Sequence, residues 1–164
     1  MIRQTLLATA AALAAFTALP ASATQAVAEP AAGPVSLSGD VKVDRTVTEN
    51  GQTRHVLVQP DKVVPGERLV FTTSYRNSGT RPIQNFVVTN PLPPAVALAE
   101  SGSADYLVSV DGGAHWGSLA SLTVSDGKGG SRPATGADVT HLRWTIPQIA
   151  PGASGTVEYH ATVR

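Results

Sequence analysis

Few residues of this chain carry side chains suited to catalysis or metal binding. The four histidines, His55, His115, His141 and His160, never occur at the short spacings that zinc and copper sites use. The chain has no cysteine, so thiolate metal sites, iron–sulfur clusters and a cysteine nucleophile are excluded. We therefore expect no metal site and no cofactor-binding site.

Other catalytic patterns are equally weak. No serine lies in a Gly-x-Ser-x-Gly motif, which presents a nucleophile on a sharp turn. Carboxylates such as Glu67, Glu100 and Asp105 lie in polar or turn-like stretches where solvation is expected. The glycine-rich segment 126–130 has no helix after it to supply an amide dipole, so we predict a loop tip rather than a phosphate loop. These patterns predict that the chain is not an enzyme.

One short motif has a defined physical role. In Ser109-x-Asp111-x-Gly113-x-His115-Trp116 the aspartate side chain can accept hydrogen bonds from the backbone amides of a tight turn. The motif resembles the Asp-box of sialidases and other β proteins, with His115 where threonine is usual. That resemblance implies a structural turn built on Ser109, Asp111 and Gly113, with no catalytic residue.

Two functional alternatives remain open for this motif. The first is a calcium site at the carboxylate of Asp111. The second is a sugar contact made by an exposed Trp116, with Tyr106 in a nearby loop as the second contact.

Residues 1–23 have the pattern of a signal peptide. Arg3 precedes an apolar stretch from Leu6 to Leu19 that is too short to span a bilayer core of about 30 Å as a helix. Ala21-Ser22-Ala23 is the small-x-small pattern that signal peptidases accept, which predicts cleavage after Ala23. Ala26-Val27-Ala28 is a second site of the same kind. The sequence thus predicts export to the periplasm, the medium or the cell surface.

The mature chain is expected to be nearly neutral and free of a lipid anchor. Without residues 1–23 it has eleven basic and twelve acidic residues, too balanced a charge for a nucleic-acid binder. No later apolar run is long enough to span a membrane, and no cysteine follows the cleavage site. Residues 24–35, rich in alanine, proline and glycine, predict a flexible leader, and residues 36–164 a folded domain.

The folded part has an apolar period of two, which is typical of half-buried strands. Asn50-Gly51 favours the positive φ angles of a type I′ turn, so a hairpin is predicted over residues 41–59. The strands are predicted over residues 41–48, 54–59, 67–77, 83–90, 106–110, 119–124, 139–146 and 155–163.

These elements predict an all-β fold, an antiparallel immunoglobulin-like β-sandwich of seven or eight strands. Its core is expected to contain Trp144, Phe71, Tyr75, Phe86 and Tyr159, because aromatic side chains carry the largest apolar area. The pattern leaves open whether the 41–59 hairpin belongs to the core sandwich.

The edges of such a sandwich have two interpretations. Pro147, Arg143 and Glu158 can blunt them, or an open edge can accept a strand from a partner. His141 and His160 point outward from the last two strands, and they would approach each other only if those strands were neighbours.

Several turn and strand segments occur together in an order that indicates a module. They are Val64-Pro65-Gly66-Glu67, Phe71 to Tyr75, Asn77-Ser78-Gly79-Thr80, Val88 to Pro93, Leu142-Arg143-Trp144 and Ala150-Pro151-Gly152. The set resembles the bacterial conserved-repeat domain, the eleventh-numbered domain of unknown function, over residues 60–164. Asn90 stands where that family more often has aspartate, and the chain has one copy rather than an array. The resemblance implies an immunoglobulin-like fold and export, and it brings no catalytic residues.

Taken together, the sequence predicts an exported, non-catalytic structural or protein-interaction module of a bacterial cell envelope. Its partner is expected to be an envelope or surface protein. The alternative is a glycan-binding module that uses the loops near Trp116 and Tyr106.

Overall fold

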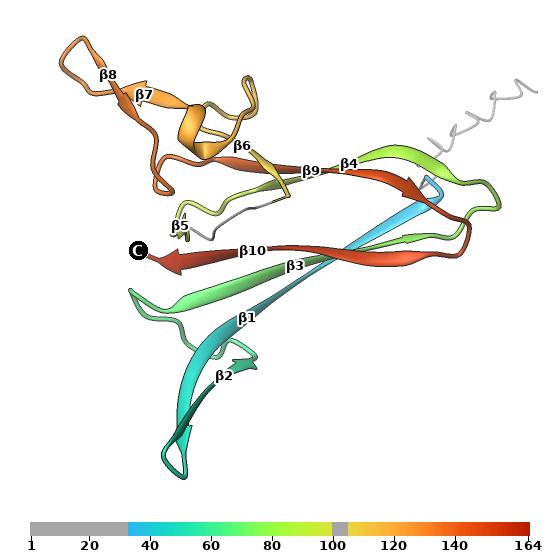
Figure 1. Ribbon diagram of the computed structural model, residues 1–164, viewed down its shortest axis with the longest axis horizontal. Helices are drawn as coiled ribbons and strands as arrows, with labels where there is room; N and C mark the ends of the chain where they lie inside the picture. Colours follow the sequence, from blue (N-terminus) through green and yellow to red (C-terminus); the bar gives the residue numbers. More distant parts are fainter. Residues whose placement is uncertain (1–32, 100–104) are drawn as a thin grey trace, which may run out of the picture. The chain divides into compact units, whose positions relative to one another are not determined.

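The computed structural model describes residues 33–99 and 105–164. Within these residues the chain forms ten strands, rather than the predicted seven or eight, and one short 3-10 helix (Figure 1). The elements are β1 (Val35–Glu49), β2 (Gln52–Val58), β3 (Arg68–Asn77), β4 (Ile83–Pro91), β5 (Val96–Leu98), β6 (Leu107–Ser109), η1 (Leu119–Ser121), β7 (Thr123–Ser125), β8 (Ser131–Pro133), β9 (His141–Ile149) and β10 (Ser154–Val163). The predicted all-β class is confirmed.

The strands form two antiparallel sheets and a separate ribbon. The larger sheet has five strands in the order β2-β1-β3-β10-β5, and the smaller has three in the order β4-β9-β6. The two sheets lie over one another in Figure 1, and β7 pairs with β8 in a ribbon at one end. The predicted antiparallel β-sandwich is therefore confirmed.

The core lies between the two sheets, and it follows from the alternation of side chains along each strand. Leu142 and Trp144 of β9 point inward, and the ring centroid of Trp144 lies 6.2 Å from that of Tyr159 in the opposite sheet. The buried apolar cluster is Val43, Leu69, Val88, Leu92, Val96, Leu98, Val108, Val139, Leu142, Trp144, Tyr159 and Ala161. Of the predicted core aromatics, Phe71 and Phe86 pack against this cluster while Tyr75 is half-buried outside it.

The first hairpin belongs to the sandwich. Asn50 and Gly51 have φ angles of 53° and 77°, as the predicted I′ turn requires, and Glu49 pairs with Gln52. β1 also pairs with β3 from Val35 to Asp44, and Val43 is fully buried. The base of the hairpin thus contributes to the core, while its turn extends away from the sheets (Figure 1).

The middle of the chain departs most from the prediction. Residues 119–124 were predicted to form one strand, but Leu119–Ser121 form a 3-10 turn and β7 begins at Thr123. The three-residue strands β5 and β8 were not predicted, because three residues are too few to show a period. The glycine-rich segment is the tip of the β7–β8 hairpin, where Asp126 accepts the amides of Lys128 and Gly130 at 2.8 and 2.9 Å.

The alternation along β9 breaks at Pro147. Residues Leu142, Trp144 and Ile146 face the core, but the next inward side chain is Ile149, which is 2% exposed. Pro147 has no N–H to donate, and Asn85 lies opposite it with a φ angle of 51°. The left-handed backbone at Asn85 breaks the alternation of inward and outward side chains at this pair of residues, so the period of two does not continue past Ile146.

The strand pairing answers two questions about the last strands. β9 lies between β4 and β6, and β10 lies between β3 and β5, but β6 pairs only with residues 141–143 of β9 and β5 only with residues 161–163 of β10. Arg143 therefore has strand neighbours on both sides, whereas Pro147 and Glu158 lie on stretches with one neighbour among the described strands, as expected for residues that blunt an edge. His141 and His160 do not approach across a ladder, because β9 and β10 belong to different sheets. The period of two shows which face a residue occupies but not which strands are neighbours.

Asn77 ties the end of β3 to the opposite sheet, and its replacement tests this packing. Its Nδ2 donates to the carbonyls of Arg81 and Ile149 at 2.8 and 3.0 Å, its Oδ1 accepts the Gly79 amide at 2.9 Å, and the residue is fully buried. We expect Asn77→Ala to lower the free energy of unfolding by about 2–4 kcal/mol, because it leaves buried backbone groups unpaired. Urea unfolding measures the change. The exposed Thr145→Ala should stay within about 0.5 kcal/mol of wild type, and equal stability of both variants would contradict this role.

Candidate functional site

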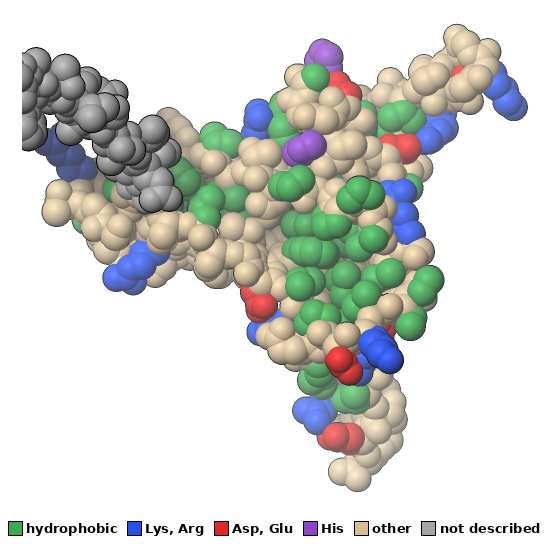
Figure 2. Space-filling view, turned by 180° about the vertical axis from the view of Figure 1, so that it is seen from behind, with side chains coloured by type: hydrophobic (Ala, Val, Ile, Leu, Met, Phe, Trp, Pro, Cys, Tyr) green, Lys and Arg blue, Asp and Glu red, His purple; other side chains and the backbone are tan. Residues whose placement is uncertain are grey.

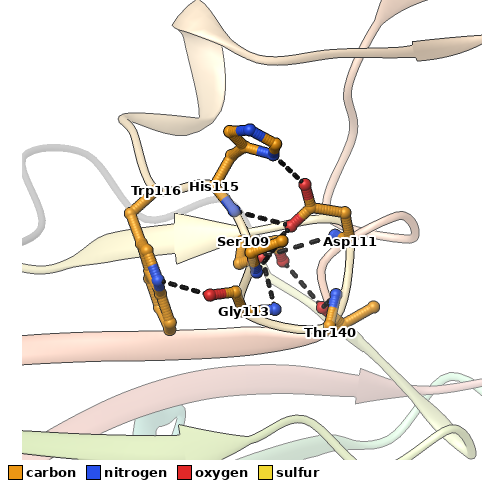
Figure 3. Close-up of polar contacts among 8 residues, drawn as sticks. Ser109, Asp111, Gly113, His115, Trp116 and Thr140 are labelled. Atoms are coloured by element: carbon orange, nitrogen blue, oxygen red, sulfur yellow. Dashed lines mark hydrogen bonds and ion pairs between the residues drawn. The ribbon is translucent and has the colours of Figure 1, made fainter.

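The first candidate site is the turn that follows β6. The Asp111 Oδ1 atom accepts the backbone N–H groups of Ala114 and His115 at 3.1 and 3.0 Å. The buried Ser109 hydroxyl donates to the same oxygen at 2.7 Å and accepts the Gly113 amide at 2.9 Å (Figure 3). Ser109, Asp111 and Gly113 are thus brought together in one hydrogen-bonded turn.

The turn is also attached to Thr140, the residue before β9. The Thr140 hydroxyl accepts the Gly112 amide at 3.0 Å and donates to the Ser109 carbonyl at 3.1 Å. These bonds fix the position of the turn relative to the smaller sheet.

Both oxygens of the Asp111 carboxylate make contacts within the turn. The backbone N–H of His115, then the Ser109 hydroxyl and the His115 side chain, hold the pKa of Asp111 well below its usual range. Its Oδ2 contacts the His115 ring at 2.5 Å, and that imidazole is otherwise exposed. Within residues 33–99 and 105–164, no group of three or more histidine or acidic side chains is arranged to hold a metal ion.

Trp116 leaves the turn and covers the outer face of β9. Its indole N–H donates to the Gly113 carbonyl at 2.8 Å. The guanidinium carbon of Arg143 lies 3.7 Å from the centroid of the indole ring, and the His141 ring meets the indole edge-on at 6.4 Å. Trp116, His141 and Arg143 therefore form one cluster on the outer face of the smaller sheet.

Tyr106 lies apart from that cluster. Its ring meets Trp144 edge-on at 5.3 Å and packs against the core. Because Arg143 and Trp144 are adjacent residues of one strand, they occupy opposite faces of the sheet. Tyr106 and Trp116 therefore do not form a single platform for a sugar ring.

The second candidate site is the open side of the sandwich, between β1 and β4. A groove of about 330 Å³ lies there, lined by Gly39, Asp40, Val41, Phe71, Thr72, Thr73, Asn90, Pro91, Pro93 and Tyr159. We call it the open-side groove. Figure 2 shows apolar side chains gathered on one face of the domain, between the first hairpin and the smaller sheet.

The open-side groove has a rigid apolar floor and a polar wall. Phe71 and Tyr159 stack in parallel, with centroids 4.8 Å apart and planes 2° from parallel. The Asn90 side chain donates to the Thr73 hydroxyl at 2.7 Å. Burial raises the pKa of Tyr159 to about 12, so its hydroxyl stays protonated at neutral pH and offers no base. No atom lies within 4 Å of the place that a Cβ on Gly39 would occupy.

A strand edge runs beside this groove. β1 pairs with β2 only from Val43 to Glu49, whereas it pairs with β3 from Val35 to Asp44. Among the described strands, residues 35–42 of β1 therefore have a neighbour on one side only. The sequence prediction starts this strand at Val41 and therefore does not include the edge, although polar and apolar residues already alternate in Ser36-Leu37-Ser38.

Comparison of the chain with protein-family models, with curated proteins and with solved structures finds no match. No helix within the described residues has the length and apolar character needed to cross a membrane. The fold and the two sites define a β-sandwich with one open side and a hydrogen-bonded turn on its smaller sheet.

The pKa shift of Asp111 predicts how stability depends on pH. A carboxylate whose pKa is lowered by folding stabilises the fold fully above its unfolded pKa of about 3.9 and loses that contribution as the pH falls toward its folded pKa. Asp111→Asn should therefore be less stable than wild type at neutral pH, and the difference should shrink as the pH falls below about 4.

Urea unfolding from neutral pH down to about pH 2 measures this difference. The exposed Asp61→Asn is the control and should follow wild type throughout. A deficit of Asp111→Asn that stays constant across the range would show that the charge of the carboxylate does not hold the turn.

Proposed function

We propose that this protein is an exported, non-catalytic interaction module of a bacterial cell envelope. It binds an extended segment of another envelope or surface protein along the open side of its sandwich. The observation that carries this proposal is the one-sided edge of β1 at residues 35–42, directly beside the apolar open-side groove.

The edge supplies the backbone part of recognition. In an antiparallel ladder, residues alternately direct their N–H and C=O groups to one neighbour and then the other. Alternate residues of Val35–Lys42 therefore present their backbone groups on the side away from β3. Such a row of groups is a template for an added strand. A bound strand would continue the line of β2, which pairs with the other half of β1.

The open-side groove supplies the side-chain part. A strand on this edge would direct every second side chain toward the inner face, where Phe71 and Tyr159 form the floor. Apolar side chains there would cover surface that the smaller sheet leaves exposed. Because the domain is nearly neutral, we expect recognition by shape and apolar contact rather than by charge.

The other strand edges of the described domain are less suited to binding a partner strand. β5 and β6 are edge strands of three residues each, too short to hold a partner strand alone. The free edge of β2 belongs to the hairpin whose turn extends away from the sheets (Figure 1). The facing edge strand, β4, ends in a proline. Residues 144–149 of β9 and 154–160 of β10 also have one strand neighbour among the described strands, but these stretches contain Pro147 and Glu158. Neither stretch supplies a run of residues to the groove as residues 39–41 of β1 do. The first half of β1 is therefore the favoured docking edge.

Export is supported by the sequence of residues 1–23, and the fold that follows is compatible with it. The described domain builds its core without any disulfide, so it can fold in either an oxidising or a reducing compartment. The resemblance of residues 60–164 to the conserved-repeat domain agrees with an exported module.

The export proposal predicts a processed chain. Protein recovered from the envelope or medium of a bacterial host should begin at Thr24, which intact-mass and N-terminal sequencing measure directly. Ala23→Asp should block processing, because the signal peptidase requires a small residue there. An unprocessed wild-type chain confined to the cytoplasm would contradict the proposal.

The docking proposal predicts different results at two neighbouring residues of β1. Gly39 lines the groove, and Ser38 points to the opposite face of the sheet. A photo-crosslinking residue placed at Gly39 in the producing cell should attach to an extended apolar segment of an envelope protein, and one at Ser38 should not.

The crosslinked segment, made as a synthetic peptide, then tests the groove directly. Gly39→Leu should weaken its binding at least about tenfold, because the new side chain fills the space that the partner would use. Ser38→Leu is the matched control and should bind as wild type does. Equal effects of the two substitutions, or crosslinks from Ser38 alone, would overturn the proposed docking edge.

A further inference from the structure

Arg143 differs from several other arginines of the domain because it has no acidic partner. Arg45, Arg54 and Arg132 each lie within 3.5 Å of a carboxylate. Among the described residues, Arg143 forms no ion pair, and its buried Nε atom has no hydrogen-bond partner. Buried polar groups are nearly always satisfied, so an exception calls for an explanation.

The position of the Arg143 guanidinium is nevertheless fixed. Its guanidinium carbon lies 3.7 Å from the centroid of the indole of Trp116, and that indole donates its N–H to Gly113 at 2.8 Å. Asp111 stabilises the turn that carries Trp116, and its carboxylate also contacts the His115 ring (Figure 3). A cation held by stacking keeps its in-plane donors for another acceptor.

The surroundings of Arg143 indicate which acceptor fits. Thr89 of β4 and Leu107 of β6 lie opposite Arg143 in the two ladders, and Thr145 and His141 lie two residues away on the same outer face. Val87 lies opposite Thr145, and Leu107 and Val87 are exposed apolar side chains. Thr89, Thr145 and His141 offer hydrogen-bonding groups, and both threonines are exposed. One arginine beside hydrogen-bonding and apolar side chains matches a ligand with one carboxylate, several hydroxyls and apolar C–H faces. A polyanion or an acidic peptide would call for several cations.

We propose that Arg143, with Trp116, His141, Thr89 and Thr145, forms a binding site for an acidic sugar of the uronic-acid class. The sugar carboxylate accepts hydrogen bonds from the terminal guanidinium nitrogens of Arg143. The threonine hydroxyls and the imidazole contact the sugar hydroxyls. This Arg143 site lies on the outer face of the smaller sheet and does not depend on the open-side groove.

An NMR titration of the ¹⁵N-labelled domain tests the proposal with three probes. They are a glucuronic-acid disaccharide, the same disaccharide with its carboxylate reduced to an alcohol, and a triglutamate peptide. The acidic disaccharide should shift the indole N–H of Trp116 and the Nε–H of Arg143. The reduced disaccharide and the peptide should bind at least about tenfold more weakly, because each lacks one half of the recognition.

Two variants locate the binding. Arg143→Gln keeps the apolar stem and a polar end but removes the guanidinium and its charge, and it should weaken binding of the acidic disaccharide at least about tenfold. Arg76→Gln removes an exposed arginine from the larger sheet and should leave the affinity unchanged.

Three outcomes would overturn the proposal. The first is no shift of the Trp116 indole with the acidic disaccharide at millimolar concentration. The second is equal binding of the reduced disaccharide, which would show that the carboxylate is not recognised. The third is tighter binding of triglutamate, which would make this an acidic-peptide site. The Gly39→Leu variant should bind the disaccharide normally, so failure here is distinguishable from failure of the docking edge.

Discussion

The two sheets of this sandwich differ in width, and the exposed features of the domain follow from that difference. Apolar side chains on the inner face of a sheet must be covered, because their removal from water is the main favourable term in folding. Three strands cover only part of a five-stranded sheet. Val43 and Leu37 occupy the same face of β1, yet Val43 is fully buried while Leu37 is 51% exposed. The open-side groove lies where the cover ends.

The outer face of the smaller sheet carries a hydrogen-bonded turn and a positioned arginine. There the chain after β6 folds back as a hydrogen-bonded turn, in which the Asp111 carboxylate accepts two backbone amides and the Ser109 hydroxyl and contacts the His115 ring. This turn places the indole of Trp116 against the guanidinium of Arg143, and the stacking fixes the position of the Arg143 side chain. The domain therefore has two distinct surfaces: a one-sided strand edge beside an apolar groove, and an outer face of the smaller sheet where Trp116 packs on Arg143.

Local patterns predict local structure well in this chain. The period of two alone predicts the inward positions of Leu142, Trp144 and Tyr159. Turn chemistry alone predicts the turn at Asn50-Gly51. Neither predicts the pairing of β1 with β3 or the assignment of β9 and β10 to different sheets, because these depend on contacts between distant segments. The stacking of Trp116 on Arg143 joins two such segments, and no local signal in the sequence indicates it.

The central claim is that the first half of β1 is an unoccupied strand edge, and residue-resolved amide hydrogen exchange tests it most directly. In the free domain, alternate amides of residues 35–42 should exchange slowly where they pair with β3 and rapidly where they face away from it. In the complex with the crosslinked partner segment, the rapidly exchanging amides should become protected. Uniform protection of these amides in the free monomer, or no change in the complex, would contradict the account.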